Sequence, residues 1–509
     1  MKADISRVTF DPLKHFTGVV MQQGRVQLDA DWNEQGSILL HHLRTLAADL
    51  IGQHGGPGDI ADPAGKLVGR RAGFAIIGAN KGASGGGPTY LPLNAVTKDE
   101  EPALAKLLTE QQFPLLITKG HYYVDGLLSE NENYWRYFEQ PYLAQASDEV
   151  LKKLAAGIYL LFLDVWERAI IEVDDPSIRE VALGGADTAA RSKLIWQVTL
   201  WPEPLGTAPD CQTFEFPTKL KAIVSANRGT LRAKARQYEP GDAADPCTIS
   251  PESRFRGIEN PLYRVEIHRG SPPPDIEPHR PATFKWSGDN GMIVAPLKKK
   301  IGDKLIVSGL RDLSRWFTAG NWVEITHDRL ELTGQPGTMV RLRDVDGETL
   351  TIDPKSATDT IYEPGKTSNG LPATNVKVRR WDQKSEGDDP LQAGAIAIKE
   401  KVWIELEDGV AVWFDFPSQG RDAAQYRTGD YWLIPARVAT GDVEWPSESV
   451  PDPDDPGKTI TQPAALTPRG IEHHYAPLAA ITVNNAPIDA RVTGVIDLRH
   501  RFGPLGVCS

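Results

Sequence analysis

Cysteine and methionine are scarce in this 509-residue sequence, which contains three of the former and four of the latter. The cysteines are Cys211, Cys247 and Cys508, an odd number without any Cys-x-x-Cys pair. This spacing predicts neither a disulfide framework nor a zinc ribbon, and it is typical of a protein kept in a reducing compartment. We therefore expect synthesis in the cytoplasm.

Long apolar runs are missing as well. No stretch approaches the roughly 20 apolar residues that a membrane-spanning helix needs, and the first seven residues lack the apolar centre of a signal peptide. We therefore expect no direct membrane insertion. Release by cell lysis, or attachment to a membrane through other subunits of a particle, would leave no mark on the sequence.

Positive charge is in short supply too. The chain has 56 Lys and Arg against 68 Asp and Glu, a formal net charge of −12 at pH 7. Its only run of three basic residues is 298–300, which fits a solvated turn. Proteins that bind nucleic acid usually concentrate Lys and Arg on one face, so we expect no nucleic-acid partner.

Turn residues and tryptophan are abundant by contrast. The 46 Gly, 39 Pro and 13 Trp are typical of short strands joined by many turns. We predict a mainly β, multidomain protein with one long N-terminal helix, α+β overall, and the length corresponds to about three domains of roughly 100–200 residues. Local patterns divide the chain into an N-terminal hairpin and long helix (1–60), a β-rich domain (61–205), an extended connection with strands (206–300), a small β-barrel-like domain (301–400) and a second small β-rich domain (401–509).

The most informative stretch is 14–35, which leads into a long amphipathic pattern. Val19-Val20 and 26–28 flank the turn pair Gln23-Gly24, so two short strands are predicted there. Asp29 or Asp31 can cap the helix that follows. Apolar residues then recur at spacings of three, four and seven, which predicts a stripe that is buried at an interface; its members are Trp32, Leu39, Leu43, Leu46 and Leu50. The stripe ends at Gly52.

Strand patterns dominate the remainder. Residues 157–165 form a nearly continuous apolar run, which predicts a buried central strand, and 262–268 and 282–286 alternate like strands with one buried face. The windows 317–325 and 426–434 align without a gap, each with an aromatic residue, a Gly and a polar residue before an apolar strand. Two related small β-barrels would explain this match, and so would convergence on a common turn.

Several patterns could in principle support chemistry. Asp164, Glu167, Glu172, Asp174 and Asp175 resemble a carboxylate cluster of a glycosidase, but acidic residues at the end of a buried strand are better explained by ion pairs with nearby arginines. His473-His474 would face opposite sides of a strand and therefore could not easily share a metal ion. We expect no catalytic residue, no cofactor and no metal, and we predict that the protein is not an enzyme.

Arg380 and Trp381 are the other candidate interface residues. Arg and Trp are enriched where interfaces bury their centre. An internal pair between an arginine and an aspartate, such as Asp382, is the alternative.

Taken together, stretches from the first residues to 497–502 resemble an uncharacterised bacterial family that is associated with gene clusters for phage-tail-like contractile injection systems. The stretches that carry this resemblance are 14–35, 159–168, 181–188, 263–268, 284–291 and 429–437. The opening segment is also similar to the start of some phage baseplate and tail-fibre proteins. Members of the family often continue into a long C-terminal fibre, whereas this sequence stops at Ser509, so we expect a compact part rather than a distal fibre.

The resemblance implies a structural component of such a particle, at or near the baseplate, that works through protein–protein assembly. Its partners would be other tail or baseplate subunits and further copies of itself as a homo-oligomer. Two alternatives come from other classes of protein. A carbohydrate-binding adhesin, or receptor-binding protein like a tail fibre, would bind a cell-surface glycan through exposed aromatic residues, and a polysaccharide-degrading enzyme would need a cleft with paired carboxylates.

Overall fold

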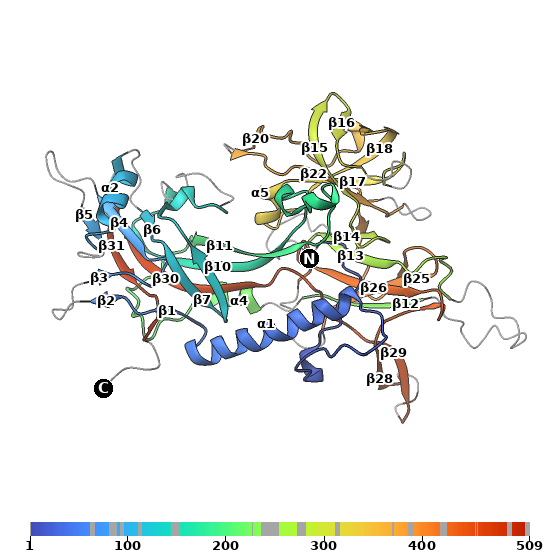
Figure 1. Ribbon diagram of the computed structural model, residues 1–509, viewed down its shortest axis with the longest axis horizontal. Helices are drawn as coiled ribbons and strands as arrows, with labels where there is room; N and C mark the ends of the chain where they lie inside the picture. Colours follow the sequence, from blue (N-terminus) through green and yellow to red (C-terminus); the bar gives the residue numbers. More distant parts are fainter. Residues whose placement is uncertain are drawn as a thin grey trace, which may run out of the picture. The chain divides into compact units, whose positions relative to one another are not determined.

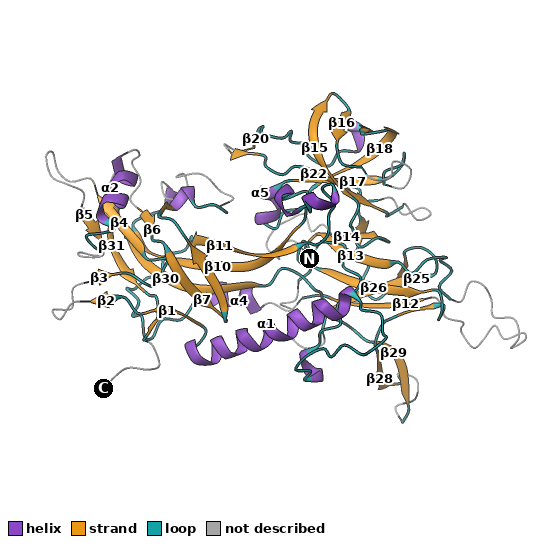
Figure 2. Ribbon diagram, in the orientation of Figure 1, coloured by secondary structure: helices purple, strands orange, loops and turns teal. Residues whose placement is uncertain are grey.

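The computed structural model describes residues 2–61, 67–80, 89–91, 96–109, 115–143, 153–225, 228–235, 254–271, 281–310, 316–368, 371–384, 391–417, 425–452, 455, 457–485 and 491–503. The chain is mainly β, with several sheets and one closed barrel (Figure 2). Contacts divide it into two compact units, each described separately below. Unit 1 contains residues 1–8, 169–192 and 225–471, and unit 2 contains 9–168, 193–224 and 472–509.

The central sheet of unit 2 has the strand order β11-β10-β30-β31 (Figure 1). These strands are β10 (Gly157–Ile170), β11 (Arg191–Leu200), β30 (His473–Val483) and β31 (Val492–Asp497). β10 and β30 are antiparallel from Gly157↔Val483 to Trp166↔His473. Residues 159–163 of β10 are all buried, which confirms the predicted central strand. Their branched and aromatic side chains fill the core on both faces of the sheet.

Smaller elements complete unit 2. One sheet contains β32 (Arg501–Phe502), β1 (His54–Pro57), β7 (Gly120–Val124) and β8 (Leu127–Asn131). A second contains β5 (Thr89–Leu91), β4 (Ile76–Asn80), β6 (Leu115–Ile117) and β9 (Trp135–Arg136), and β2 (Ile60–Ala61) pairs with β3 (Leu67–Gly69). The helices are α1 (Asp29–Ile51), α2 (Glu101–Thr109) and α4 (Thr218–Ser225), with 3₁₀ turns at Pro12–Lys14 and Tyr137–Glu139.

The segment before α1 differs from its prediction. Residues 15–28 are all described and form no strand, although the turn at Gln23-Gly24 is present. The prediction of two paired strands is therefore wrong. An isolated two-stranded hairpin is only marginally stable, and here the chain contacts the helix instead, because the Val19 amide donates to Gln35 Oε1 at 2.7 Å.

α1 begins and ends at recognisable signals. The Asp31 carboxylate accepts a hydrogen bond from the Leu28 amide at 3.2 Å, and Gly52 follows the last turn with a φ of 89°. The helix contacts β1 and β7 of unit 2 (Figure 1). Within the described parts of the chain, no helix combines the length and apolar character that crossing a bilayer would require.

The closed barrel belongs to unit 1. Its strands are, in order around the barrel, β15 (Val294–Ile301), β16 (Lys304–Val307), β19 (Thr349–Ile352), β18 (Thr338–Asp346), β17 (Trp322–Thr326) and β22 (Lys377–Trp381). Aliphatic residues from every strand, such as Leu305, Val323 and Leu350, fill the interior. Closure leaves no unpaired strand edge in the ring.

The remaining sheets of unit 1 surround a second core. The five-stranded sheet contains β23 (Ile396–Ala397), β14 (Thr283–Ser287), β13 (Leu262–Arg269), β26 (Tyr431–Arg437) and β27 (Asp442–Val443). The three-stranded sheet contains β12 (Thr230–Ala235), β25 (Val410–Asp415) and β24 (Trp403–Glu405). The other elements are β20 (Thr367–Ser368) with β21 (Leu371–Pro372), β28 (Ser447–Pro451) with β29 (Thr459–Pro463), α5 (Asp328–Leu332), and 3₁₀ turns at Pro176–Ile178, Val181–Leu183 and Pro354–Ser356.

The two aligned windows enter strands of different sheets. The first leads into β17 of the closed barrel, and the second into β26 of the five-stranded sheet, which is open. The hypothesis of two related barrels is therefore wrong for the described strands. The match reflects a shared local form, because Gly320 and Gly429 both have a φ near 90° just before a strand that starts with aromatic residues.

Candidate functional site

Exposed apolar side chains are concentrated near the start of the chain. Of the 25 large apolar side chains that are exposed in the described residues, twelve lie between positions 13 and 50, with exposures of 46–86%. They are Leu13, Phe16, Val20, Met21, Val26, Leu28, Trp32, Leu39, Leu40, Leu43, Leu46 and Leu50. We call residues 13–50 the N-terminal apolar segment. Monomeric soluble proteins rarely expose contiguous apolar surface of more than a few hundred Å², so this segment is the strongest candidate for a functional surface.

The α1 helix presents two different faces. The five residues of the predicted stripe, from Trp32 to Leu50, are all exposed by 53–69% in the single chain. Spacings of seven, four, three and four residues place them along one side of the helix. Ala30 and Ile38, on the other side, are buried at 2% and 0% exposure. The stripe is therefore an additional apolar face that is exposed among the residues the structure describes.

Unit 2 holds α1 firmly enough for this face to have a defined direction. The Arg44 guanidinium forms two hydrogen bonds with the Glu167 carboxylate of β10, at 2.8 and 3.0 Å. Gly126, in the turn between β7 and β8, lies so close that a Cβ atom there would be 2.2 Å from the Arg44 carbonyl oxygen. Thr9 donates to Glu34 at 2.6 Å, which ties the preceding segment to the helix.

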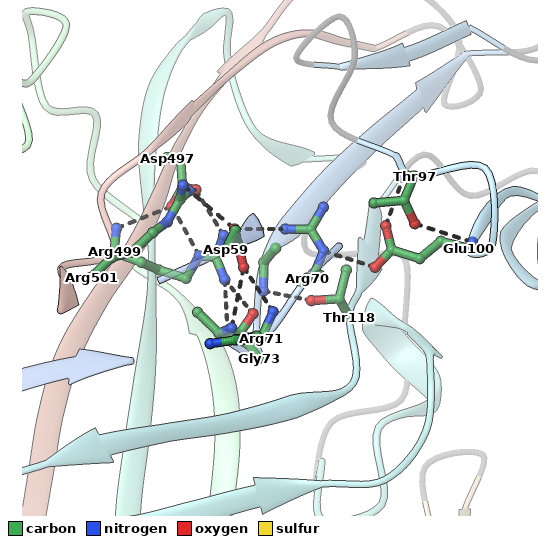
Figure 3. A network of polar contacts seen from close by, with 12 residues as sticks. Asp59, Arg70, Arg71, Gly73, Thr97, Glu100, Thr118, Asp497, Arg499 and Arg501 are labelled. Atoms are coloured by element: carbon green, nitrogen blue, oxygen red, sulfur yellow. Dashed lines mark hydrogen bonds and ion pairs between the residues drawn. The ribbon is translucent and has the colours of Figure 1, made fainter. Parts of the chain in front are cut away.

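A network of charged residues holds the two ends of unit 2 together (Figure 3). Arg499 is buried and donates to the Ala72 and Gly73 carbonyl oxygens at 2.9 and 2.8 Å, and to Asp497 at 2.8 Å. Burial alone would raise the pKa of Asp497, but Arg499 and Arg501 lower it to about 2. The Asp497 carboxylate is thus ionised and paired with two arginines, Arg499 and Arg501. We interpret this part of the network as a structural clamp.

The clamp continues through a second arginine. Arg70 Nε contacts Glu100 Oε1 at 2.8 Å, and a guanidinium nitrogen of Arg70 lies 3.8 Å from Asp59. Asp59 also accepts a hydrogen bond from the Arg71 amide at 2.9 Å, and Glu100 accepts one from the Thr97 amide at 3.0 Å (Figure 3). The strands near both termini of unit 2 are therefore fixed by the same set of charges.

Unit 1 contains a second, deeply buried group of charges. Lys285 Nζ lies 2.6 Å from Glu324 Oε1 and 3.3 Å from Glu266 Oε1, and Arg264 Nε lies 2.8 Å from Glu266 Oε2. Lys2 Nζ also contacts Glu266, at 2.6 Å. Burial alone would raise the pKa of Glu266, but Lys2, Lys285 and Arg264 together hold it well below its ordinary value. Each carboxylate is compensated, so these residues have a structural role.

Sequence patterns do not reveal this buried group. The alternation of residues 262–268 predicts one buried face, yet β13 is buried on both faces between Tyr263 and His268. Glu266 therefore points into the protein although its position in the alternation indicates solvent. The sequence signal for this group is a charged residue of opposite sign, such as Lys285, within another strand that is otherwise apolar.

Arg380 and Trp381 lie inside unit 1. Trp381 is fully buried, and its indole nitrogen donates to Glu324 Oε2 at 3.0 Å. Arg380 contacts Asp289 at 2.6 Å and Asp382 at 3.0 Å. The internal alternative therefore describes these two residues, and the interface hypothesis for the indole is wrong in this fold, because β22 presents Trp381 to the interior.

The histidine pair and a cluster of carboxylates, the other candidate groups, each bind neighbouring side chains. His473 Nδ1 lies 2.7 Å from Asp164, whereas His474 Nδ1 lies 2.9 Å from Asp125, so the two imidazoles have different partners. In unit 1, carboxylate oxygens of Asp174, Asp328 and Glu331 lie within 4.8 Å of one another, which is a spacing that a metal ion could use. The Lys377 ammonium already lies between two of them, 2.5 Å from Asp174 and 2.9 Å from Glu331. We therefore interpret the group as an ion-pair cluster.

Comparisons with known proteins give a family but no relative of known function. A family model described as a family of unknown function (DUF6519) matches residues 1–61, 100–208 and 205–488. No curated protein and no solved structure matches the chain.

Proposed function

The chain belongs to the DUF6519 family, and we propose that it is a non-enzymatic structural component of a phage-tail-like contractile injection system, at or near the baseplate, that acts through protein–protein assembly. The observation that carries the assembly role is the exposed apolar stripe on α1. The kind of particle rests on the resemblance described from the sequence stretches above. Neighbouring subunits or further copies of the chain would cover the stripe.

The energetics favour an occupied surface. Full burial of a Leu-sized side chain stabilises a complex by about 1.5–3 kcal/mol, so each half-exposed residue of the stripe would contribute on the order of 1 kcal/mol when covered. Five such residues would contribute several kcal/mol, and the remaining apolar residues of the segment would add to this. That is enough to offset part of the entropic cost of association. A helix already fixed by Arg44 and Gly126 would also lose little freedom on binding.

Aromatic residues give little support to the adhesin alternative. All 13 tryptophans lie in the described part of the chain, and Trp32 is the single one whose side chain is largely exposed, at 69%. A sugar-binding surface uses exposed flat rings, whereas Trp166, Trp286 and Trp432 lie in or against hydrophobic cores. Trp32 belongs to the apolar stripe, so it fits protein contact better than glycan contact.

The proposal is tested by placing charge in the stripe. The double variant Leu43→Asp/Leu46→Asp should fold but be absent from purified particles, because two carboxylates cannot be buried without partners. The matched control is Val181→Asp/Leu183→Asp, which changes two exposed apolar residues outside the segment and should be incorporated normally. Both variants are expressed in cells that produce the particle, and incorporation is measured by immunoblot of purified particles. Normal incorporation of the stripe variant would contradict the proposal.

A further inference from the structure

A cavity of about 420 Å³ opens on unit 1, far along the chain from the N-terminal apolar segment. Its walls carry five carboxylates, those of Glu259, Asp289, Asp382, Glu407 and Asp408. Two cationic side chains, Arg380 and Lys384, also line it. Five acids against two bases leave the cavity with an excess of negative charge.

The two cations do not neutralise the carboxylates evenly. Arg380 is bound to Asp289 at 2.6 Å and to Asp382 at 3.0 Å. Lys384 is largely exposed and reaches Glu407 only at 4.0 Å, the limit of an ion pair. Glu407 and Asp408 therefore form the more negative end of the cavity, where solvent-exposed Lys384 offers weak compensation.

A buried phenol at the wall gives an independent indication of a ligand. Tyr263 has an exposure of 1%, lines the cavity, and its ring packs against Trp286 with centroids 6.0 Å apart. Among the described residues no hydrogen bond of its hydroxyl is found, and the oxygen keeps some access to solvent at the cavity. Burial, and then the nearby charges of Glu407 and Asp408, raise the pKa of this phenol, so the hydroxyl stays protonated and available. A phenol hydroxyl that is unpaired within the described residues and reaches the cavity can donate a hydrogen bond to a molecule bound there.

We propose that this cavity binds an organic cation, a guanidinium or ammonium group carried on an aliphatic stem. Its volume lies in the range of small-molecule sites, roughly 300–1,000 Å³, and is far larger than a bare metal ion needs. Carboxylates at Glu407 and Asp408 match the donors of a guanidinium. Ile258, which is 92% exposed at the cavity, supplies an apolar contact for the stem.

The ionisation of the cavity is consistent with this ligand. Burial, followed by the charge of Asp382, raises the pKa of Glu407 to about 6. A bound cation would reverse this shift, because it favours the carboxylate over the carboxylic acid. The inference concerns unit 1 alone and does not depend on the proposed assembly role.

The test is titration calorimetry of the full-length chain with Nα-acetyl-arginine amide and its neutral isostere, Nα-acetyl-citrulline amide. The arginine compound should bind and the citrulline compound should bind at least tenfold more weakly. Glu407→Gln and Asp408→Asn should each weaken binding of the arginine compound at least tenfold. Asp455→Asn, at an exposed carboxylate elsewhere in unit 1, is the matched control and should bind as the unaltered chain does. Circular dichroism checks that all variants are folded.

Further arms distinguish the source of the cation. Agmatine is a free small molecule that carries a guanidinium group and a primary amine. If it binds more tightly than the blocked arginine, the ligand is a small-molecule amine of this kind. The reverse order would indicate an arginine side chain of a polypeptide. The proposal is overturned if arginine and citrulline compounds bind equally, if neither binds at millimolar concentration, if only calcium chloride gives a signal, or if folded Glu407→Gln and Asp408→Asn bind normally.

Discussion

Individual charges, rather than apolar contacts alone, define the interior of unit 1. Glu324 accepts hydrogen bonds from the Gly337 amide at 3.1 Å and the Trp381 indole at 3.0 Å, besides its contact with Lys285. Breaking one member of such a buried group leaves the others uncompensated, which costs more than the intact pair contributes. The stability of unit 1 therefore depends on single carboxylates.

We expect Glu324→Gln to lower the free energy of unfolding of unit 1 by about 3–5 kcal/mol, because the buried Lys285 ammonium would lose its nearest carboxylate. Urea denaturation followed by tryptophan fluorescence measures the change. Glu444→Gln removes a half-exposed ion pair with Arg437 and should cost at most about 1 kcal/mol. Equal losses in the two variants would contradict this account.

The same carboxylate sets an expected pH dependence. Burial alone would raise the pKa of Glu324, but Lys285 and Lys2, followed by His268, hold it well below its ordinary value. The unfolded chain, with an ordinary Glu pKa of about 4.3, therefore binds a proton at a higher pH than the folded chain. The contribution is fully present above that value and is lost as pH falls through the folded pKa. The stability difference between the unaltered chain and Glu324→Gln should accordingly shrink below about pH 4.

At single positions, local patterns leave alternatives open more often than they decide between them. An internal pair for Arg380 is one such alternative, and the structure shows it with Asp289 as well as Asp382. Asp289 could not be named from the sequence, because it lies 91 residues away along the chain. The cavity carboxylates escape prediction for the same reason, since Glu259 and Glu407 meet only after several strands have paired.

Among the elements, α1 shows how a helix can have one face committed to its own unit and another left free. The committed side depends on the close approach of the turn between β7 and β8. Glycine is required at position 126 for two reasons. Its φ is 77°, and a Cβ atom added there would lie only 2.2 Å from the Arg44 carbonyl oxygen.

We expect Gly126→Ala to loosen α1, because the added methyl group forces the helix backbone away from the turn. Hydrogen exchange of the amides in residues 29–51 should accelerate at least tenfold, measured by mass spectrometry. Gly24→Ala is the matched control: it has a similar φ of 72°, but nothing lies within 4 Å of its Cβ position. It should change exchange in α1 little. Similar effects of both substitutions would show that backbone strain, not the contact with Arg44, is responsible.

Local patterns predict elements well where the side chains themselves determine burial. The apolar run of β10 and the turn at Gln23-Gly24 are both present. The strands expected beside that turn are absent from residues 15–28. β-branched residues favour an extended backbone, but a strand is stable only when further strands or a helix pack against it. Val20 and Val26 are exposed instead, which the alternation alone could not indicate.

At the scale of the whole molecule, each unit is assembled from segments that lie far apart in sequence. β10 pairs with β30, so residue 157 lies opposite residue 483. Composition predicts the mainly β class, because turn residues and tryptophan report on strand length and packing. It cannot predict such pairings, since register depends on long-range contacts rather than local pattern. Each of the two compact units combines three separate stretches of the chain. The predicted domains, which are continuous segments, therefore cannot reproduce these units.

The same scale decides what covers the N-terminal apolar segment. If copies of the chain cover one another's stripes, light scattering coupled to size-exclusion chromatography should give a stable trimer or hexamer for the full-length chain. Leu43→Asp/Leu46→Asp should then elute as a monomer, because the introduced carboxylates cannot be buried, while Val181→Asp/Leu183→Asp should retain the oligomer. A full-length chain that is monomeric at every concentration would contradict self-association and would assign the stripe to a different subunit. The particle experiment would still test that assignment, since incorporation depends on the stripe whichever subunit covers it.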